Sequence, residues 1–452
     1  MRKRRFVRNT ALLSGSSVLM SLIALGFHAW LAGRIGAAGL GLVQLVGAVN
    51  ALAATFAISG VRFAATRLVA EELGASRGGG VPAALRRCLG YAAFFGAAAG
   101  ILLGSCAARI GGSWIGDGRT VEPLRLCALS MPCVSLCAAM SGYFTACGRL
   151  KHPTLIHLAE QLLGVALAAL FLRQAPQGDL EAACAAVVCG QVLADLAALL
   201  LMALACRADR QRYFPLRAAG RGQTRRLLTI SLPLAASAYA RSGLSTAQQL
   251  LIPRGLRASG AGAEDALAGY GVVHGMALPL LLFPSCVLAA AAELIVPELT
   301  QEQMRRDETR IRRAVRGFLG LSLLYAAAAA ALLFVFAGPL GRLLFHSEEA
   351  AHSIRMLAPL VPVMYLDMSV DGCLKGLGQQ VWSMGINVLD SLSGLLLVWL
   401  LLPRYGLPGY LFVVVATETL NFLLSGLRLL TVLRASPAGA ARRWPARPGQ
   451  RA

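Results

Sequence analysis

The chain has 452 residues, of which 57% are hydrophobic and only 14% are charged, whereas a soluble domain carries about 25% charged residues. Its mean hydropathy is +0.63. These values exclude a disordered protein, a secreted disulfide scaffold and an ordinary cytosolic enzyme, and they indicate a polytopic membrane protein.

Apolar runs that are long enough to cross a membrane follow one another along the whole chain. A membrane helix needs about 20 mostly apolar residues, and twelve windows meet this requirement. They cover residues 10–32, 38–60, 86–107, 124–147, 155–173, 181–206, 227–251, 268–296, 317–337, 354–374, 381–402 and 408–430. The first window follows the basic start MRKRRFVRNT and is too long for the apolar part of a typical signal peptide, so we expect an uncleaved first helix. Such continuous runs exclude a β-barrel, and the sequence predicts an all-α polytopic membrane protein with about 12 transmembrane helices.

The Lys and Arg residues are distributed unevenly between the segments that connect these windows. An even number of spans places both ends of the chain on one side, and cytoplasmic segments carry the excess of Lys and Arg. If the amino end is cytoplasmic, the cytoplasmic segments hold 32 of the 43 Lys and Arg residues and the opposite segments hold 10. The sequence therefore predicts both termini in the cytoplasm. The net charge of +21 follows from this topology and from contact with anionic membrane lipids, and no nucleic-acid partner is expected.

The chain matches itself at an offset of 230 residues. The matched pairs include Gly41 and Gly271, Arg125 and Arg355, Pro132 and Pro362, Gly142 and Gly372, Gly148 and Gly378, and Glu160 and Asp390. The alternative is coincidence in a chain rich in Gly and Ala, but the matches fall at equivalent places in spans 1–6 and 7–12. We therefore predict two parallel six-helix lobes around a central cavity. The predicted organisation is an N-terminal lobe at 1–206, a basic cytoplasmic linker at 207–226, a C-terminal lobe at 227–433 and a basic cytoplasmic tail at 434–452.

Ionisable side chains within the spans are costly in lipid and usually face a cavity or one another. They are Glu160, Asp195, Arg241, Asp367, Asp371, Asp390 and Glu418. Arg241 lies 14 residues after Leu227, about 21 Å along a helix, so its side chain does not easily reach the inner surface. Pro233 and Gly243 in the same span favour a bent or broken helix, and broken helices in corresponding positions of two lobes point to a binding site.

Three arginines are candidate ligands of an anionic substrate. Arg34, Arg62 and Arg241 would give the central cavity a positive field, and a guanidinium binds phosphate oxygens in a bidentate way while it stays charged. Each has an alternative role, because Arg241 could pair with an acidic residue, Arg34 could anchor the interface and Arg62 could belong to the cytoplasmic excess. Glu160 and Asp390 are open between helix pairing and a coupling site for protons or sodium.

The sequence contains no recognisable catalytic motif. Walker A, HExxH and GxSxG patterns do not occur, and the string GAAGLG follows a membrane span, not a strand. The 11 Cys residues form no CxxC pair and no His cluster accompanies them. We therefore expect a transporter and not an enzyme, with no catalytic residue, no cofactor and no bound metal.

Several stretches resemble a known family in order along nearly the whole chain. They are GRIGAAGLGLVQLV, ISGVRFAATRLVAEE, SGYFTACGRLKHPT, LAEQ, LIPRGLRASG, YGVVHGMALPLLLFPSCVLAAAAELIVPELTQEQ and LKGLGQQ. Together they resemble the stage V sporulation protein B branch of the polysaccharide transporter family. That branch belongs to the multidrug, oligosaccharidyl-lipid and polysaccharide export superfamily and is similar to lipid II flippases.

The resemblance implies a flippase of the bacterial plasma membrane with a central cavity between two lobes. Such proteins are thought to move undecaprenyl-diphosphate-linked saccharides from the inner to the outer leaflet, and in the sporulation branch the product would be spore cortex peptidoglycan. Basic cavity residues contact the diphosphate in the similar flippases, and Arg34, in the GRIG segment, matches that pattern best. The partners implied are a lipid-linked anionic saccharide and cell-wall polymerases. The alternative functions are a cation-coupled multidrug exporter and a non-transporting scaffold for cell-wall synthesis.

Overall fold

The structure is a computed structural model that describes residues 2–74, 80–176, 178–210, 223–305 and 307–434. Helices make up nearly all of these residues. The first half contains α1 (Arg2–Ile58), α2 (Val61–Gly74), α3 (Gly80–Arg109), the π-helix η1 (Ile110–Ile115), the 3-10 helix η2 (Gly118–Thr120), α4 (Val121–Ala146), α5 (Lys151–Gln174) and α6 (Leu180–Arg210).

The second half repeats this pattern with shorter helices. It contains α7 (Gln223–Ala258), α8 (Ala263–Tyr270), the π-helix η3 (Gly271–Ala277), α9 (Leu278–Leu282), α10 (Ser285–Arg305), α11 (Glu308–Val335), α12 (Ala337–Phe345), α13 (Glu348–Leu357), the 3-10 helix η4 (Ala358–Leu360), α14 (Val361–Gly376) and α15 (Gln380–Arg434). The predicted linker at 207–226 overlaps the end of α6 and the start of α7, and its residues 211–222 lie outside the described part. Residues 435–452 of the predicted tail lie outside it too.

The two longest helices each cross the bundle twice. In α1, Gly36 has φ +70, and the Gln44 Nε2 atom lies 3.4 Å from the His28 Nδ1 atom, although 16 residues of straight helix would separate them by about 24 Å. The chain therefore reverses at Gly36, where the φ angle favours glycine. The same reversal occurs in α15 at Gly406, with φ +59, because the Arg428 guanidinium lies 4.3 Å above the Trp382 ring.

These reversals explain how the described residues make twelve crossings. Nine helical stretches are long and apolar enough to span a membrane, and the turns within α1 and α15 add two further crossings. The remaining crossing is α7, whose 36 residues extend about 54 Å but which is too polar to qualify by hydropathy. The prediction of about twelve helices in two lobes is confirmed.

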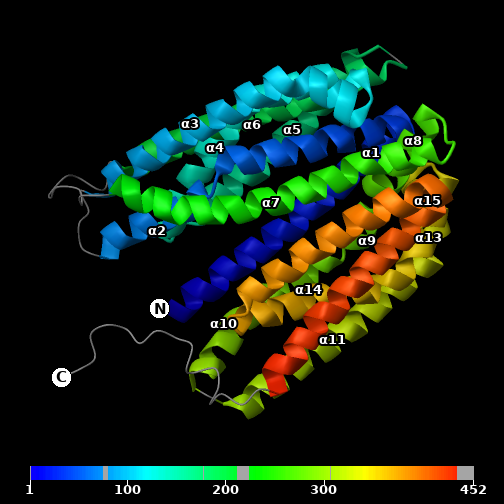
Figure 1. Ribbon diagram of the computed structural model, residues 1–452. Coiled ribbons are helices and arrows are strands. Elements are labelled where there is room, and N and C mark those ends of the chain that lie inside the picture. Colours follow the sequence, from blue (N-terminus) through cyan, green and yellow to red (C-terminus); the bar gives the residue numbers. More distant parts are fainter. Residues whose placement is uncertain (1, 75–79, 177, 211–222, 306, 435–452) are drawn as a thin grey trace, which may run out of the picture.

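The two lobes are visible as two bundles that meet at one end and diverge toward the other (Figure 1). Helices α1 to α6 form the first lobe, and α7 to α15 form the second, of which α7 is the first crossing. Helix α7 packs against α1 and α2 on one side and against α15 on the other. The first half of α1 runs between the bundles (Figure 1), so the interface between the lobes is built mainly from α1, α7, α8 and η3.

The internal repeat predicted from the sequence has a structural counterpart. Helix α4 covers residues 121–146, and the residues 230 positions later form α13, η4 and α14. A Cβ atom on Gly142 would lie 2.4 Å from the Arg62 carbonyl oxygen, and one on Gly372 would lie 2.8 Å from the Ala292 Cβ atom. Arg62 and Ala292 are themselves 230 positions apart. The lobes are therefore two copies of one helical arrangement.

Two reciprocal contacts close the bundle at the end where α1 reverses, which we call the closed end. A Cβ atom on Gly41 would lie 2.2 Å from the Leu267 carbonyl oxygen, and one on Gly271 would lie 2.0 Å from the Ala37 carbonyl oxygen. The two contacts exchange under the 230-residue offset, so a pseudo-two-fold axis passes between them. Only glycine allows the backbone of α1 to approach those of α8 and η3 this closely.

The break expected in the seventh span is absent. Pro233 and Gly243 favour a bent or broken helix, and α7 runs unbroken from Gln223 to Ala258. The irregular segment lies in the next crossing, where η3 widens to a π-helix and residues Phe283 and Pro284 separate α9 from α10. Proline is tolerated in α7 because neighbouring helices can satisfy the backbone groups that it frees.

Candidate functional site

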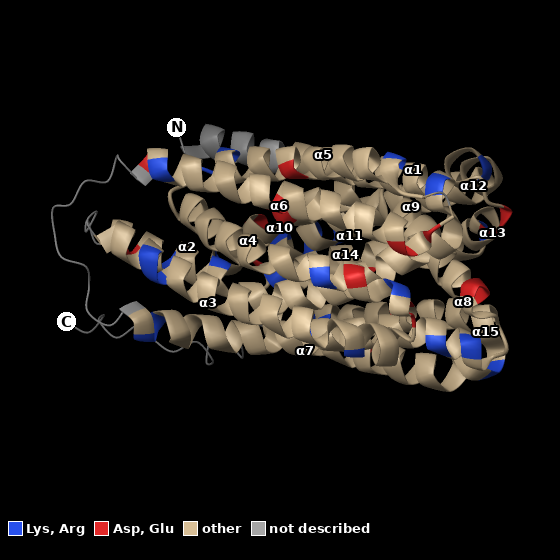
Figure 2. Cartoon of the chain, turned by 90° about the horizontal axis from the view of Figure 1, so that it is seen from above, with Lys and Arg blue, Asp and Glu red and all other residues tan. Residues whose placement is uncertain are grey.

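Two cavities lie at the interface between the lobes. The Arg62 cavity has a volume of about 530 Å³, and the Arg241 cavity has a volume of about 410 Å³. The Arg62 cavity is lined by Ser16, Ser17, Met20, Arg62, Ser141, Thr145, Leu150, Pro153, Thr154, His157, Glu160, Gln161, Gln191, Ala289, Ala290 and Glu293. The Arg241 cavity is lined by Ala48, Ala51, Thr55, Ala238, Arg241, Ser242, Ser245, Thr246, Gln249, Asn387, Asp390 and Ser391. Figure 2 shows charged residues in the middle of the bundle as well as at its ends.

The two cavities occupy equivalent positions in the repeat. Three of the α5 residues that line the first cavity have counterparts 230 positions later in α15 that line the second. These pairs are His157 and Asn387, Glu160 and Asp390, and Gln161 and Ser391. Each cavity is therefore formed by the first and fifth crossings of one lobe together with a helix of the other lobe. The carboxylates follow the repeat, but Arg62 and Arg241 come from non-equivalent crossings, so each cavity has its own arrangement of charge.

Arg62 stands at the start of α2, directly after a break in the second crossing. Ser59 has φ +42 and Gly60 has φ +71, and the Gly60 Cα faces the Ser231 backbone of α7. This break turns the helix so that the exposed Arg62 side chain lines the cavity. Among the described residues, its guanidinium has neither an ion pair nor a hydrogen bond to a side chain. It is therefore available to an anion.

Arg241 lies near the middle of α7, and its exposed side chain lines the second cavity. No described carboxylate lies within ion-pair distance of its guanidinium, so the structure does not contain the acidic partner that the sequence left open. Asp390 lines the same cavity without pairing with Arg241. An arginine at membrane depth without an acidic partner is costly unless it faces water or a ligand, so Arg241 is a candidate ligand-binding residue.

Arg34 lies apart from both cavities. It belongs to the turn at the closed end, where its side chain is exposed, and it lines neither the Arg62 cavity nor the Arg241 cavity. The structure thus brings Arg62 together with Glu160, and Arg241 together with Asp390, but it separates Arg34 from all four. A role for Arg34 in substrate binding stays a prediction.

The two equivalent carboxylates differ in their partners. The Glu160 Oε2 atom lies 2.9 Å from the His157 Nδ1 atom, so this carboxylate is engaged within its own helix. The Asp390 Oδ1 atom is buried and has no hydrogen-bond partner among the described residues, because Asn387 replaces the histidine. Asp390 is therefore the carboxylate that is free to bind a ligand.

The sequence did not single out the polar side chains that surround Arg241. Ser242, Ser245 and Gln249 lie on the same face of α7 and line the cavity. The Gln249 amide donates to the Ser245 hydroxyl at 3.3 Å and accepts from the Tyr270 hydroxyl at 3.2 Å. The signal that could have found them is the low hydropathy of a helix that must nevertheless cross the membrane.

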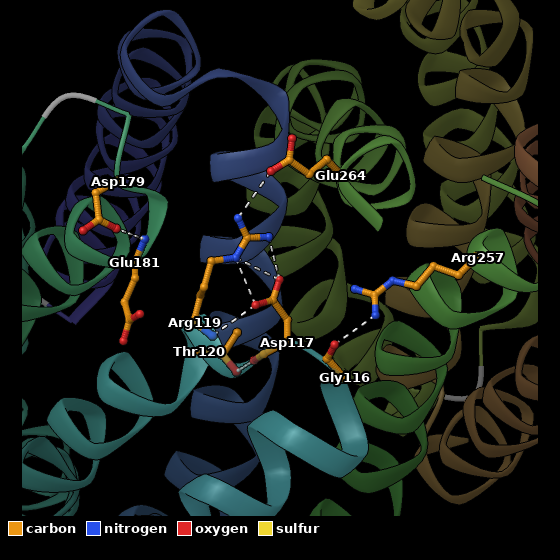
Figure 3. A network of polar contacts seen from close by, with 8 residues as sticks. All are labelled: Gly116, Asp117, Arg119, Thr120, Asp179, Glu181, Arg257 and Glu264. Atoms are coloured by element: carbon orange, nitrogen blue, oxygen red, sulfur yellow. Dashed lines mark hydrogen bonds and ion pairs between the residues drawn. The ribbon is translucent and has the colours of Figure 1, made fainter. Parts of the chain in front are cut away.

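The closed end is held by polar contacts as well as by glycine packing (Figure 3). Asp117 accepts hydrogen bonds from the Arg119 Nε and Nη2 atoms at 3.0 and 2.8 Å, and Arg119 reaches Glu264 of the other lobe at 3.6 Å. Arg257 at the end of α7 donates to the Gly116 carbonyl at 3.0 Å. Burial acts to raise the pKa of Asp117, but the Arg119 hydrogen bonds and the charges of Arg119 and Arg257 lower this pKa below its usual value. The hydrogen bonds and charges around Asp117 therefore favour its ionised form.

No metal site is evident in the part of the chain that the structure describes. No group of three or more His, Cys, Asp or Glu residues is placed to hold a metal ion there. All 11 Cys residues are free thiols. The chemistry that the two cavities offer is therefore the binding of charged and hydroxyl-bearing groups.

Comparison with known proteins places this arrangement in a family. The family model described as polysaccharide biosynthesis protein matches residues 6–303, and the model described as MatE matches residues 258–400. The chain belongs to the polysaccharide biosynthesis protein family. It is 23% identical to stage V sporulation protein B of Bacillus subtilis (strain 168) over 444 residues, which cover 96% of this chain and 85% of that protein. It is also 23% identical to sporulation protein YkvU of the same organism over 310 residues, which cover 68% of this chain and 69% of that protein.

Solved structures of transporters share the fold. An inward-facing multidrug resistance MATE family transporter of the MOP superfamily superposes with a TM-score of 0.69 at 15% identity, and the match covers 92% of this chain and 96% of that one. An outward-facing structure with a similar description superposes with a TM-score of 0.60 at 15% identity, covering 96% and 97%. The family and the shared fold describe a multi-pass membrane protein, and the solved structures that share this fold are MATE family transporters.

Proposed function

We propose that this transporter is a flippase that moves an undecaprenyl-diphosphate-linked saccharide from the inner to the outer leaflet of the bacterial plasma membrane. Lipid II and polysaccharide precursors belong to this class of substrate, and cortex peptidoglycan of the spore is one product it would serve. The observation that carries the proposal is that Arg62 and Arg241 line cavities at the lobe interface without an ion-pair partner among the described residues. Each offers a charged guanidinium to a diphosphate.

The mechanism would be alternating access between the lobes. The closed end would face the outside, and both termini would lie in the cytoplasm, as the distribution of Lys and Arg predicts. A diphosphate would enter from the diverging end, neutralise an arginine and allow the lobes to rock about the pseudo-two-fold axis. The membrane potential, negative inside, favours outward movement of an anion by about 2.3 kcal/mol per charge per 100 mV. Anionic inner-leaflet lipids and cell-wall polymerases are the further partners that we expect.

The experiment is a flip assay in vesicles that contain the purified protein and labelled lipid II. Arg241→Ala should abolish translocation while expression and insertion stay intact, and Arg241→Lys should retain part of the rate because it keeps the charge but loses the bidentate geometry. Arg404→Ala is a matched control, since Arg404 is exposed at the turn within α15 and lines neither cavity. The proposal would be refuted if the Arg241→Ala variant moved labelled lipid II across the vesicle membrane at the wild-type rate.

A cation-coupled multidrug exporter is the second candidate. It is favoured by the MatE match over residues 258–400 and by the carboxylate of Asp390, which lines a cavity without a partner. A cationic drug would meet Arg62 and Arg241, and like charges repel in a low-dielectric cavity. Ethidium efflux that survives Arg241→Ala and fails in Asp390→Asn would support this candidate, whereas a scaffold for cell-wall synthesis would transport neither substrate.

A further inference from the structure

The Arg241 cavity is lined by side chains of both signs of charge, which come from two different helices. Arg241 comes from α7 and Asp390 from α15, and the two line one cavity without forming an ion pair. Hydroxyl and amide groups line the same cavity, and the Ser242 hydroxyl and the Asn387 amide make no hydrogen bond to a described residue. Such a cavity offers a cationic pole, an anionic pole and neutral polar groups in one space of about 410 Å³.

The charge arrangement limits which ligand can fill this cavity. A bare diphosphate would be attracted by Arg241 but repelled by Asp390, because like charges in a poorly hydrated site interact strongly. A cationic ligand would meet the opposite conflict at Arg241. A ligand that is anionic at one end and rich in hydroxyl donors at the other satisfies both walls, since a carboxylate accepts hydrogen bonds from hydroxyl groups and charge-assisted bonds of this kind are strong.

The Arg62 cavity allows a comparison between the two equivalent carboxylates, Glu160 and Asp390. There the carboxylate of Glu160 is engaged by His157 at 2.9 Å, whereas the counterpart of His157 is Asn387, which leaves the Asp390 carboxylate without a partner. The buried Asp390 Oδ1 atom lacks a hydrogen-bond donor among the described residues. A buried acceptor in that state can take a hydrogen bond from water or from a ligand, and a sugar ring presents several donors.

We propose that the Arg241 cavity is a phosphosugar subsite, in which Arg241 binds the phosphate and Asp390 with Asn387 binds hydroxyl groups of the first sugar. The proposal rests on the proposed function and adds that the cavity distinguishes a saccharide-bearing carrier from the bare lipid diphosphate. Asp390 thereby acts as a specificity residue. Its negative charge repels the diphosphate of a carrier that has lost its sugar. Its oxygens accept hydrogen bonds from the sugar hydroxyl groups of a carrier that has kept it.

The test compares two probes on the purified full-length protein in nanodiscs. The probes are undecaprenyl diphosphate and undecaprenyl diphosphate linked to N-acetylglucosamine, and the readout is the dissociation constant of each. Asp390→Asn should weaken binding of the sugar-bearing probe about tenfold or more, as expected for the loss of a hydrogen bond to a charged group, and should leave binding of the bare diphosphate unchanged or tighter. Arg241→Ala should weaken binding of both probes.

Asp371→Asn is the matched control, because this aspartate of the same lobe pairs with Lys375 at 2.5 Å and lines neither cavity. It should change neither constant. If Asp390→Asn does not fold, Asn387→Ala tests the same wall and should also weaken only the sugar-bearing probe. Equal loss for both probes, or none, would overturn the subsite.

The remaining outcomes distinguish failure of the proposed subsite from failure of the proposed function. Loss of a sodium or proton dependence in Asp390→Asn, with sugar discrimination intact, would overturn the subsite in favour of a coupling ion. Wild-type protein that is folded but binds neither probe would refute the proposed function itself. Wild-type protein that binds both probes equally well would refute only the subsite.

Discussion

The reciprocal glycine contacts predict that adding one methyl group opens the closed end. In Gly271→Ala the new Cβ atom would lie 2.0 Å from the Ala37 carbonyl oxygen, whereas real Cβ atoms essentially never approach closer than 3.0 Å. The neighbour is backbone and cannot rotate away, so α1 and η3 must separate by about 1 Å. Overpacking of this size costs about 1–3 kcal/mol, which would shift the equilibrium between closed and open about 5–150-fold.

The assay measures access to the Arg241 cavity. Ser245 is replaced by Cys in a variant that lacks the native Cys residues. Intact cells are then treated with a maleimide that does not cross the membrane, and the labelling rate is measured. Labelling should accelerate in Gly271→Ala and equally in the equivalent Gly41→Ala, and the double variant should add little because either methyl group already separates the helices. Gly47→Ala, with nothing within 4 Å of the new Cβ atom, is the control. An unchanged labelling rate with an unchanged melting temperature would refute the reasoning.

Three further predictions concern stability. Because the pKa of Asp117 is lowered in the folded state, its ionised carboxylate stabilises the fold above the usual pKa of about 3.9, and this contribution is lost as the pH falls through the folded-state value. The melting temperature of the wild type should therefore fall more than that of Asp117→Asn between about pH 5 and pH 3, and parallel curves would contradict this. Gly148→Ala and Gly378→Ala, with φ +68 and +73, should each cost about 1–2 kcal/mol of unfolding free energy; a difference between these equivalent turns in denaturant titration would count against the repeat. Glu160→Gln should cost about 1 kcal/mol or less, because its histidine partner is 42% exposed, and a larger loss would show a structural role.

Much of the fold could be predicted because lipid imposes a strict requirement on length and polarity. Apolar windows located the crossings, and the short gap between the windows at 10–32 and 38–60 contains Gly36, where the chain reverses. The repeat was visible in positions such as Gly148, whose role in a turn does not depend on neighbouring side chains. The continuity of α7 could not be predicted, since whether Pro233 breaks a helix depends on the helices that pack around it.

The candidate site could be predicted only in part, because a cavity is a property of several helices at once. Depth along α7 identified Arg241, and offset matching identified Asp390 as the counterpart of Glu160. That Arg241 and Asp390 share one cavity depends on how α7 packs against α15, which no local pattern encodes. The separation of Arg34 from the cavities has the same origin, since its place in the turn follows from the reversal and not from its charge.

The polarity of α7 has a consequence for biosynthesis. Its arginines, serines and glutamines make it the one described crossing that fails a hydropathy test which nine other stretches pass, and a charged residue at the centre of a helix opposes release from the translocon by about 2.5–3.5 kcal/mol. Such a segment does not enter lipid readily by itself. We therefore expect α7 to remain at the translocon until α8 to α10 emerge. These helices would then enter the membrane together as a helical hairpin that packs against the first lobe.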